Sequence, residues 1–178
     1  ARLIKDVVDE EVKTATFQLG SLKAPGPDGY PGFFYHQHWD IVGPSLCVAV
    51  RIFFRGGFLL KEMNHTNLVL IPKVQVRETL SQFRPISLCY FNKKVITKIL
   101  ANRLKGVLYF VVSPNQSAFV AGRLIQDNIL VAHEAFHALK IRKGKVEDVA
   151  IKVDFHKAND RVDWSFLQAL LCKMGFHS

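Results

Sequence analysis

The chain has 178 residues, of which 49% are hydrophobic and 22% are charged. This length and composition fit one folded domain with a hydrophobic core and argue against a disordered or low-complexity protein. Lys and Arg outnumber Asp and Glu by 24 to 15, and the net charge of +9 favours a polyanionic partner such as nucleic acid.

No apolar run approaches the roughly 20 residues that cross a membrane, and the N-terminus lacks the charged-then-apolar pattern of a signal peptide. The three cysteines, Cys47, Cys89 and Cys172, show no paired spacing, so the sequence predicts neither a disulfide framework nor a cysteine zinc site. A reducing compartment, the nucleus or the cytoplasm, is therefore the expected location. The chain begins without methionine and ends shortly after a predicted helix, so we expect a piece of a longer polypeptide.

Apolar residues at helical spacing predict four helices before residue 140. The first ends at the Pro-Gly-Pro-Asp-Gly run of residues 25–29, because proline and glycine interrupt helices. The second covers residues 44–54, the third residues 96–111 and the fourth residues 125–139. The apolar residues that mark the first helix are Val8, Val12, Ala15, Leu19 and Leu22, and those that mark the third are Ile96, Ile99, Leu100, Leu104, Val107, Leu108 and Val111. In the second and fourth helices the side chains expected to be buried are Leu46, Val50, Phe53, Ile125, Ile129, Ala132, Phe136 and Leu139.

Two short apolar runs, residues 66–71 and 83–88, predict a β-hairpin between the second and third helices. Pro85 lacks a backbone N–H and therefore places the second strand at an edge. The hairpin is expected to carry Lys73 and Arg84 outward.

Near the C-terminal end, residues 151–155 alternate in polarity, as a half-buried strand does. Asp154 is then expected to point away from Ile151, Val153 and Phe155. Asp163 is a candidate cap for a following helix over residues 164–174. A carboxylate at a strand tip before a helix is one way to hold a divalent cation, and a solvated strand-end residue is the alternative.

A competing motif lies in the fourth predicted helix, where His133, Glu134 and His137 match the H-E-x-x-H signature of zinc proteases. The extended form of this signature requires glycine and histidine at positions that hold Lys140 and Lys143 here. We therefore expect these histidines at the helix surface and keep a zinc metalloprotease-like site as a further alternative.

Seven segments stand in an order that points to one family. They are KAPGPDG (23–29), LIPK (70–73), FRPISLC (83–89), KILANRLK (98–105), QSAFV (116–120), DNI (127–129) and IKVDFHKANDRVDW (151–164). In this the chain resembles the reverse transcriptases of non-LTR retrotransposons, the long interspersed elements, and most closely the plant-type ones.

The resemblance implies an α+β fold, a partial right-hand polymerase. Residues 1–148 would form mostly helical fingers, with a hairpin and the connection to the palm, and residues 149–178 the first strand and helix of the palm. Asp154 would be the first catalytic carboxylate, shared by two Mg2+ ions. Lys73, Arg84, Phe155 and Asn159 would bind the incoming deoxynucleoside triphosphate, and Lys23, Gln116 and Arg123 would contact the RNA template or the DNA primer.

Two departures from the family pattern affect this expectation. Asn159 stands where the family usually has an aromatic residue that excludes the ribose 2′-hydroxyl, and the later paired-aspartate motif is absent from these residues. We therefore expect a fragment of an RNA-directed DNA polymerase that is inactive on its own, from a decayed copy of the element. A non-catalytic nucleic-acid-binding module is the alternative, and the sequence does not indicate an oligomeric state.

Overall fold

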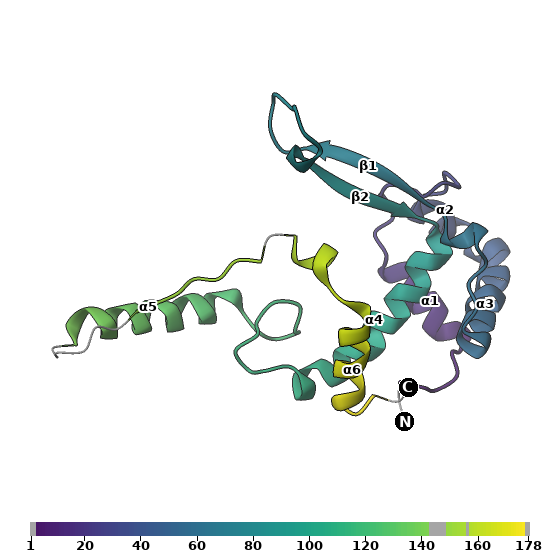
Figure 1. Ribbon diagram of the computed structural model, residues 1–178. Helices are drawn as coiled ribbons and strands as arrows, with labels where there is room; N and C mark the ends of the chain where they lie inside the picture. Colours follow the sequence, from purple (N-terminus) through teal and green to yellow (C-terminus); the bar gives the residue numbers. More distant parts are fainter. Residues whose placement is uncertain (1–2, 143–148, 156, 177–178) are drawn as a thin grey trace. The chain divides into compact units, whose positions relative to one another are not determined.

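The computed structural model describes residues 3–142, 149–155 and 157–176. The chain divides into two compact units, Ala1–Gly106 and Val107–Ser178, each of which is described by itself. Figure 1 shows the helices and the β-hairpin along the chain. No helix in the described ranges is long and apolar enough to cross a membrane.

The core of the first unit lies among α1 (Asp9–Gln18), α3 (Trp39–Gly56) and α4 (Phe91–Val111). The boundary between the two units falls within α4, after Gly106. Every fourth residue of α4, from Phe91 through Val95 and Ile99, is buried, so one side of the helix faces this core. The other buried apolar residues of the core are Val7, Val12, Ala15, Leu46, Cys47, Val50 and Ile96.

The helix predictions for this unit are largely confirmed. Leu46 and Val50 are buried as expected, and Val12 and Ala15 are buried on α1. Helix α1 ends at Gln18, before the predicted stop at residues 25–29, so Leu22 lies beyond it and is 90% exposed, and Val8 just before it is 54% exposed. Leu100 and Leu104, two of the apolar residues that predicted the third helix, are exposed on α4. The short helix α2 (Gly32–Gln37) was missed, because six residues span fewer than two turns and show no clear period.

The hairpin between α3 and α4 is confirmed. Its strands, β1 (Thr66–Pro72) and β2 (Phe83–Cys89), pair antiparallel in a two-stranded sheet. Short 3-10 turns, η1 (Glu62–Asn64) and η2 (Leu80–Gln82), precede the two strands. Pro85 lies opposite Leu70 and is tolerated because both strands of a two-stranded sheet are edges.

The second unit contains the end of α4, α5 (Ile125–Ile141), η3 (Ala158–Arg161) and α6 (Trp164–Lys173). The prediction that the apolar residues of α5 are buried was wrong, because Ile125, Ile129 and Phe136 are each more than half exposed. The helix forms although its apolar face is uncovered, because its backbone hydrogen bonds are internal.

The strand predicted for residues 151–155 is not formed, and Ile151, Val153 and Phe155 are exposed. A strand needs a neighbour to receive its hydrogen bonds, and within the described residues β1 and β2 pair with each other. The following helix is confirmed, because the Asp163 carboxylate accepts a hydrogen bond from the Phe166 amide at 2.8 Å and Gly175 ends the helix with φ of 90°.

Candidate nucleic-acid interface

The hairpin places Lys73 and Arg84 on the same face. Ile71 pairs with Arg84 in the sheet register, and Lys73 follows Ile71 by two residues and projects to the same side. The Lys73 amide donates to the Gln82 carbonyl at 2.8 Å, which continues the ladder past the end of β1. Both side chains are exposed, as predicted.

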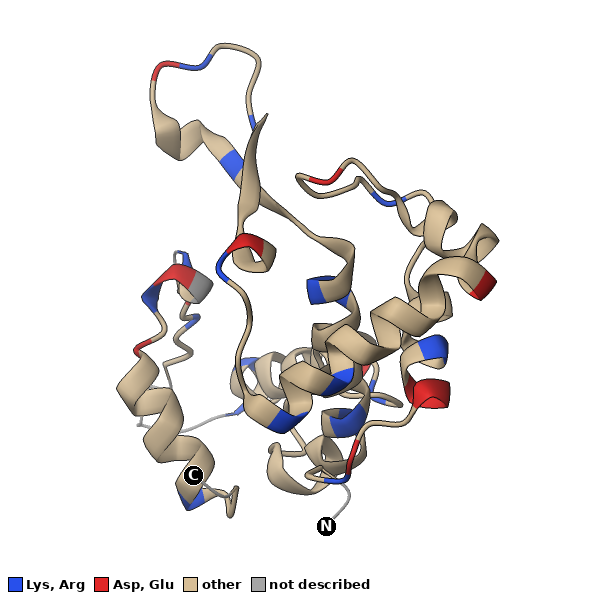
Figure 2. Cartoon of the chain, turned by 90° about the vertical axis from the view of Figure 1, so that its right-hand side faces the viewer, with Lys and Arg blue, Asp and Glu red and all other residues tan. Residues whose placement is uncertain are grey.

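The two cations differ in their present partners. The Lys73 ammonium donates to the Ser81 carbonyl at 3.0 Å, while Arg84 makes no hydrogen bond or ion pair within the described ranges. The connection between the strands carries residues of both signs, Arg77 and Glu78 (Figure 2). An unengaged guanidinium keeps its two-pronged set of donors available for an oxyanion.

The Pro-Gly-Pro-Asp-Gly loop packs directly against the base of this hairpin. Gly26 is buried, and a Cβ atom there would lie 2.4 Å from the Cys89 carbonyl oxygen. The Lys94 ammonium donates to the Ala24 carbonyl at 2.8 Å. Lys23 at the start of the loop is exposed, so the contact fixes the loop while leaving this charge in solvent.

In the second unit, the guanidinium group of Arg123 donates its hydrogen bonds to backbone carbonyls. Its guanidinium donates to the carbonyls of Ser113, Gln116 at 2.7 Å, Val112 at 3.3 Å and Tyr109 at 3.4 Å. These carbonyls belong to the end of α4 and the start of the loop that follows it. Arg123 therefore holds that loop, and the exposed Gln116 side chain is part of what it positions.

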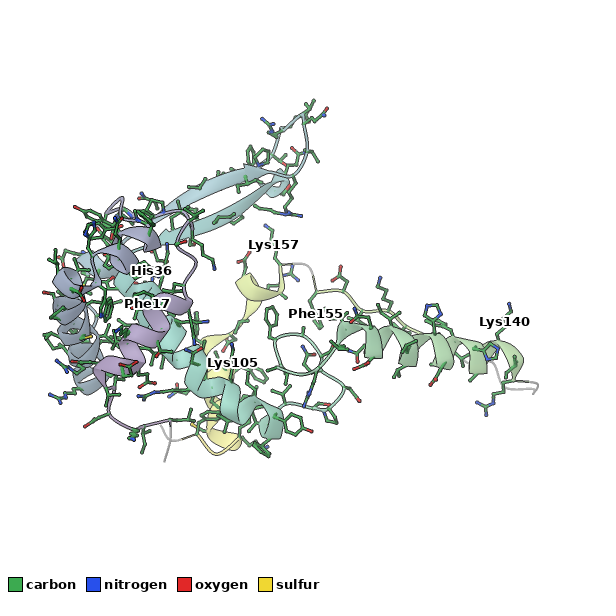
Figure 3. All side chains as sticks on the ribbon, turned by 180° about the vertical axis from the view of Figure 1, so that it is seen from behind. Phe17, His36, Lys105, Lys140, Phe155 and Lys157 are labelled. Atoms are coloured by element: carbon green, nitrogen blue, oxygen red, sulfur yellow. The ribbon has the colours of Figure 1, made fainter. Side chains whose placement is uncertain are left out.

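Asp154 lies within residues 149–155, which form neither a helix nor a strand, and it is exposed. Figure 3 labels the neighbouring Phe155 and Lys157. The Phe155 side chain is 73% exposed, and Lys157 has a left-handed φ of 54°. Asn159 lies in η3, and its side chain is outside the described part of the structure. Lys73 and Arg84 belong to the first unit, and Asp154, Phe155, Asn159, Gln116 and Arg123 to the second.

A metal ion needs several donor side chains that converge on one point. Across residues 3–142, 149–155 and 157–176, no group of three or more His, Cys, Asp or Glu side chains is arranged to hold an ion. Asp154 alone is one carboxylate, so the described residues do not by themselves fit a two-ion magnesium site. His133 and His137 are exposed on α5 and gain no third ligand there, which leaves the zinc alternative without support.

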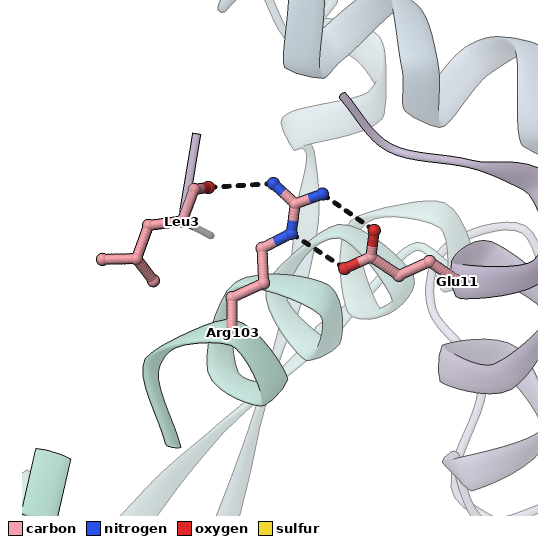
Figure 4. Close-up of polar contacts among 3 residues, drawn as sticks. All are labelled: Leu3, Glu11 and Arg103. Atoms are coloured by element: carbon pink, nitrogen blue, oxygen red, sulfur yellow. Dashed lines mark hydrogen bonds and ion pairs between the residues drawn. The ribbon is translucent and has the colours of Figure 1, made fainter. Parts of the chain in front are cut away.

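An ion pair that the sequence predictions missed holds the first unit together. Arg103 donates to both carboxylate oxygens of Glu11 at 2.8 Å and to the Leu3 carbonyl at 2.9 Å (Figure 4). The Glu11 hydrogen bonds raise the pKa of the Arg103 guanidinium above its ordinary value. The signal in the sequence was the spacing, because Arg103 continues the stripe formed by Val95 and Ile99.

A hollow of this unit adjoins that ion pair. It has a volume of about 400 Å³ and is lined by Lys5, Asp6, Val8, Glu10, Glu11, Thr14, Asn102 and Arg103. Charges of both signs line it, so it lacks the single-sign field that attracts a polyanion.

Comparison with known proteins adds two findings. Residues 71–178 match the family described as reverse transcriptase (RNA-dependent DNA polymerase). The transposon TX1 uncharacterized 149 kDa protein of Xenopus laevis is 31% identical over 175 residues, which are 98% of this chain and 13% of that protein. The chain thus spans a small part of the relative that it matches.

Proposed function

Because this chain belongs to the reverse transcriptase (RNA-dependent DNA polymerase) family, we propose that it is the segment of a non-LTR retrotransposon enzyme that runs from the fingers into the palm. The reverse transcriptase family predicted from the sequence motifs is thereby confirmed, and the plant-type assignment stays a prediction. In the proposal, residues 1–148 are the fingers and their connection, and residues 149–178 begin the palm. The transposon relative supports an origin in a mobile element.

The observation that carries the proposal is the shared hairpin face of Lys73 and Arg84. We assign these residues to the triphosphate of an incoming deoxynucleotide. An arginine fork grips two phosphate oxygens, and a lysine on the same face adds a point charge. Arg84 is exposed and makes no hydrogen bond or ion pair within the described residues, so it can bind phosphate without breaking an existing contact.

Nucleic-acid binding is assigned to residues of both units. Lys23, exposed beside the docked glycine-proline loop, and Gln116, in the loop that follows α4, are proposed to contact the RNA template or the DNA primer. The donors of Arg123 are engaged by backbone carbonyls, so we propose that Arg123 acts by positioning the Gln116 loop. Binding through phosphates is expected to be independent of sequence and to weaken with salt.

Asp154 is proposed as one carboxylate of the catalytic metal site, with Phe155 and Asn159 beside the bound nucleotide. In such sites Mg2+ neutralises the charge that develops during nucleotidyl transfer. The paired-aspartate motif that the family resemblance implies does not occur in these 178 residues, so we expect this segment alone to lack templated DNA synthesis. Efficient primer extension by the 178-residue chain would contradict this expectation.

The proposal is tested by measuring the binding of a fluorescent deoxynucleoside triphosphate and of a labelled RNA–DNA primer–template. Replacing both Lys73 and Arg84 by Ala is expected to weaken triphosphate binding by about ten-fold or more, because hydrogen bonds to charged groups are lost. Arg77→Ala is the matched control, since it removes a charge from the connection of the same hairpin.

Two results would contradict the assignment of the hairpin face. Equal weakening by Arg77→Ala and by the double variant would indicate a general charge effect. Salt-sensitive binding of nucleic acid with no measurable triphosphate binding would favour the non-catalytic binding module instead.

A further inference from the structure

Phe119, in the loop between α4 and α5, combines full exposure with an unusual backbone. Its side chain is 96% exposed, and its φ of 64° lies in the left-handed region that bulky residues rarely adopt. The next residue, Val120, is 7% exposed. The chain therefore turns sharply so that Val120 is buried and the Phe119 ring stands in solvent.

The loop that carries this ring is fixed at both ends. Arg123 binds four carbonyls at the end of α4 and the start of the loop. From the other side, the Asn128 amide of α5 donates to the Asn115 carbonyl and the Ser117 hydroxyl, both at 3.0 Å. A ring on such a loop is held ready for contact rather than left on a loose tip.

We propose that Phe119 is a stacking platform for an unpaired base of a single-stranded RNA. A flat aromatic ring accepts the face of any base, so this contact suits a protein that binds templates of varied sequence. The net charge of +9 favours a polyanionic occupant over a neutral one. This inference rests on the proposed function, which supplies the strand.

A second exposed aromatic provides an internal comparison. Phe110, on the last turns of α4, is 81% exposed, but its backbone is an ordinary helix. If exposure alone decided binding, Phe110 and Phe119 would contribute alike. The strained and braced position of Phe119 assigns the platform to that residue.

The test measures fluorescence anisotropy of a labelled single-stranded oligoribonucleotide with the 178-residue chain. Phe119→Leu, which keeps an apolar side chain but removes the ring, is expected to weaken binding roughly 5- to 150-fold, the usual effect of losing one base stack. Phe119→Tyr and Phe110→Leu are expected to bind like the unaltered chain. An oligonucleotide of abasic residues is expected to bind the unaltered chain and Phe119→Leu equally.

A separate variant distinguishes loss of binding from loss of folding. Phe119→Gly relieves the left-handed backbone and is expected to raise the midpoint of thermal unfolding while losing the same binding as Phe119→Leu. A fall in that midpoint with lost binding would overturn the proposal by assigning Phe119 a structural role.

The remaining outcomes separate this inference from the proposed function. Salt-sensitive RNA binding that Phe119→Leu leaves unchanged would overturn the platform and leave the proposed function intact. No binding of any nucleic acid by the unaltered chain would overturn both. Self-association of the chain in sedimentation, abolished by Phe119→Leu, would show that a second copy covers the ring and would also overturn the platform.

Discussion

Removal of Arg103 is expected to destabilise the first unit strongly. The Arg103 side chain is 8% exposed and that of Glu11 is 28% exposed, so Arg103→Ala leaves a partly buried carboxylate without its partner. The variant also loses the hydrogen bond to the Leu3 carbonyl and the packing over the Phe54 ring, 5.3 Å from the guanidinium carbon to the ring centroid.

The expected cost follows from this burial. Breaking a buried ion pair by removing one partner costs about 3–5 kcal/mol, and the partial exposure of Glu11 places the expected value near the lower end, about 3 kcal/mol. Arg51 and Asp9 form the matched control, because the Arg51 side chain is 35% exposed and that of Asp9 is 60% exposed. Arg51→Ala is expected to cost no more than about 1 kcal/mol.

Urea unfolding followed by circular dichroism measures both variants, and repeating it in high salt adds a second discriminator. The exposed pair should weaken with salt, whereas the Arg103 pair should change little. Replacing Arg103 and Glu11 together by Met should recover most of the stability, since an apolar pair leaves no charge unpaired. If Arg103→Ala and Arg51→Ala cost the same, the buried pair does not stabilise the unit as argued.

Three further predictions follow from individual side chains. Gly26→Ala should lower the free energy of unfolding, measured in urea, by about 1–3 kcal/mol, because the new Cβ would overlap the Cys89 carbonyl. Gly106→Ala is the control: it lies in an open helical position and should raise the free energy of unfolding by about 0.5–1 kcal/mol, because alanine is the better helix former. Burial raises the pKa of Tyr35 from 10.0 to about 12. The neutral phenol therefore contributes its full stability to the folded chain below pH 10, and this contribution is lost as the pH rises toward 12. Tyr35→Phe should reduce this alkaline loss of stability in a circular dichroism titration. Burial raises the pKa of the Cys47 thiol, so Cys47 should resist a thiol reagent in the folded chain while the exposed Cys172 reacts at once, as peptide mass spectrometry would reveal.

The helices of the first unit could be predicted because their apolar spacing reflects a core that forms within that unit. Val12, Val50 and Ile99 come from three different helices and are all fully buried. The sequence analysis did not single out Arg103, although this residue is buried in the structure. A charged residue that continues an apolar stripe is the pattern expected of a buried pair, but its partner on α1 is distant in sequence and carries no local signal.

The second unit shows why equally clear patterns had different outcomes. Helices α5 and α6 form with exposed apolar stripes, because a helix satisfies its backbone within one segment. Residues 151–155 have an equally regular alternation, but a strand must borrow its hydrogen bonds from a neighbour. The alternation of polar and apolar residues thus specifies which side chains would share a face of a strand. Whether the strand forms at all depends on hydrogen bonding to a neighbouring strand. The direction in which Asp154 presents its carboxylate therefore depends on the strands that pair with this segment, and local sequence alone does not determine it.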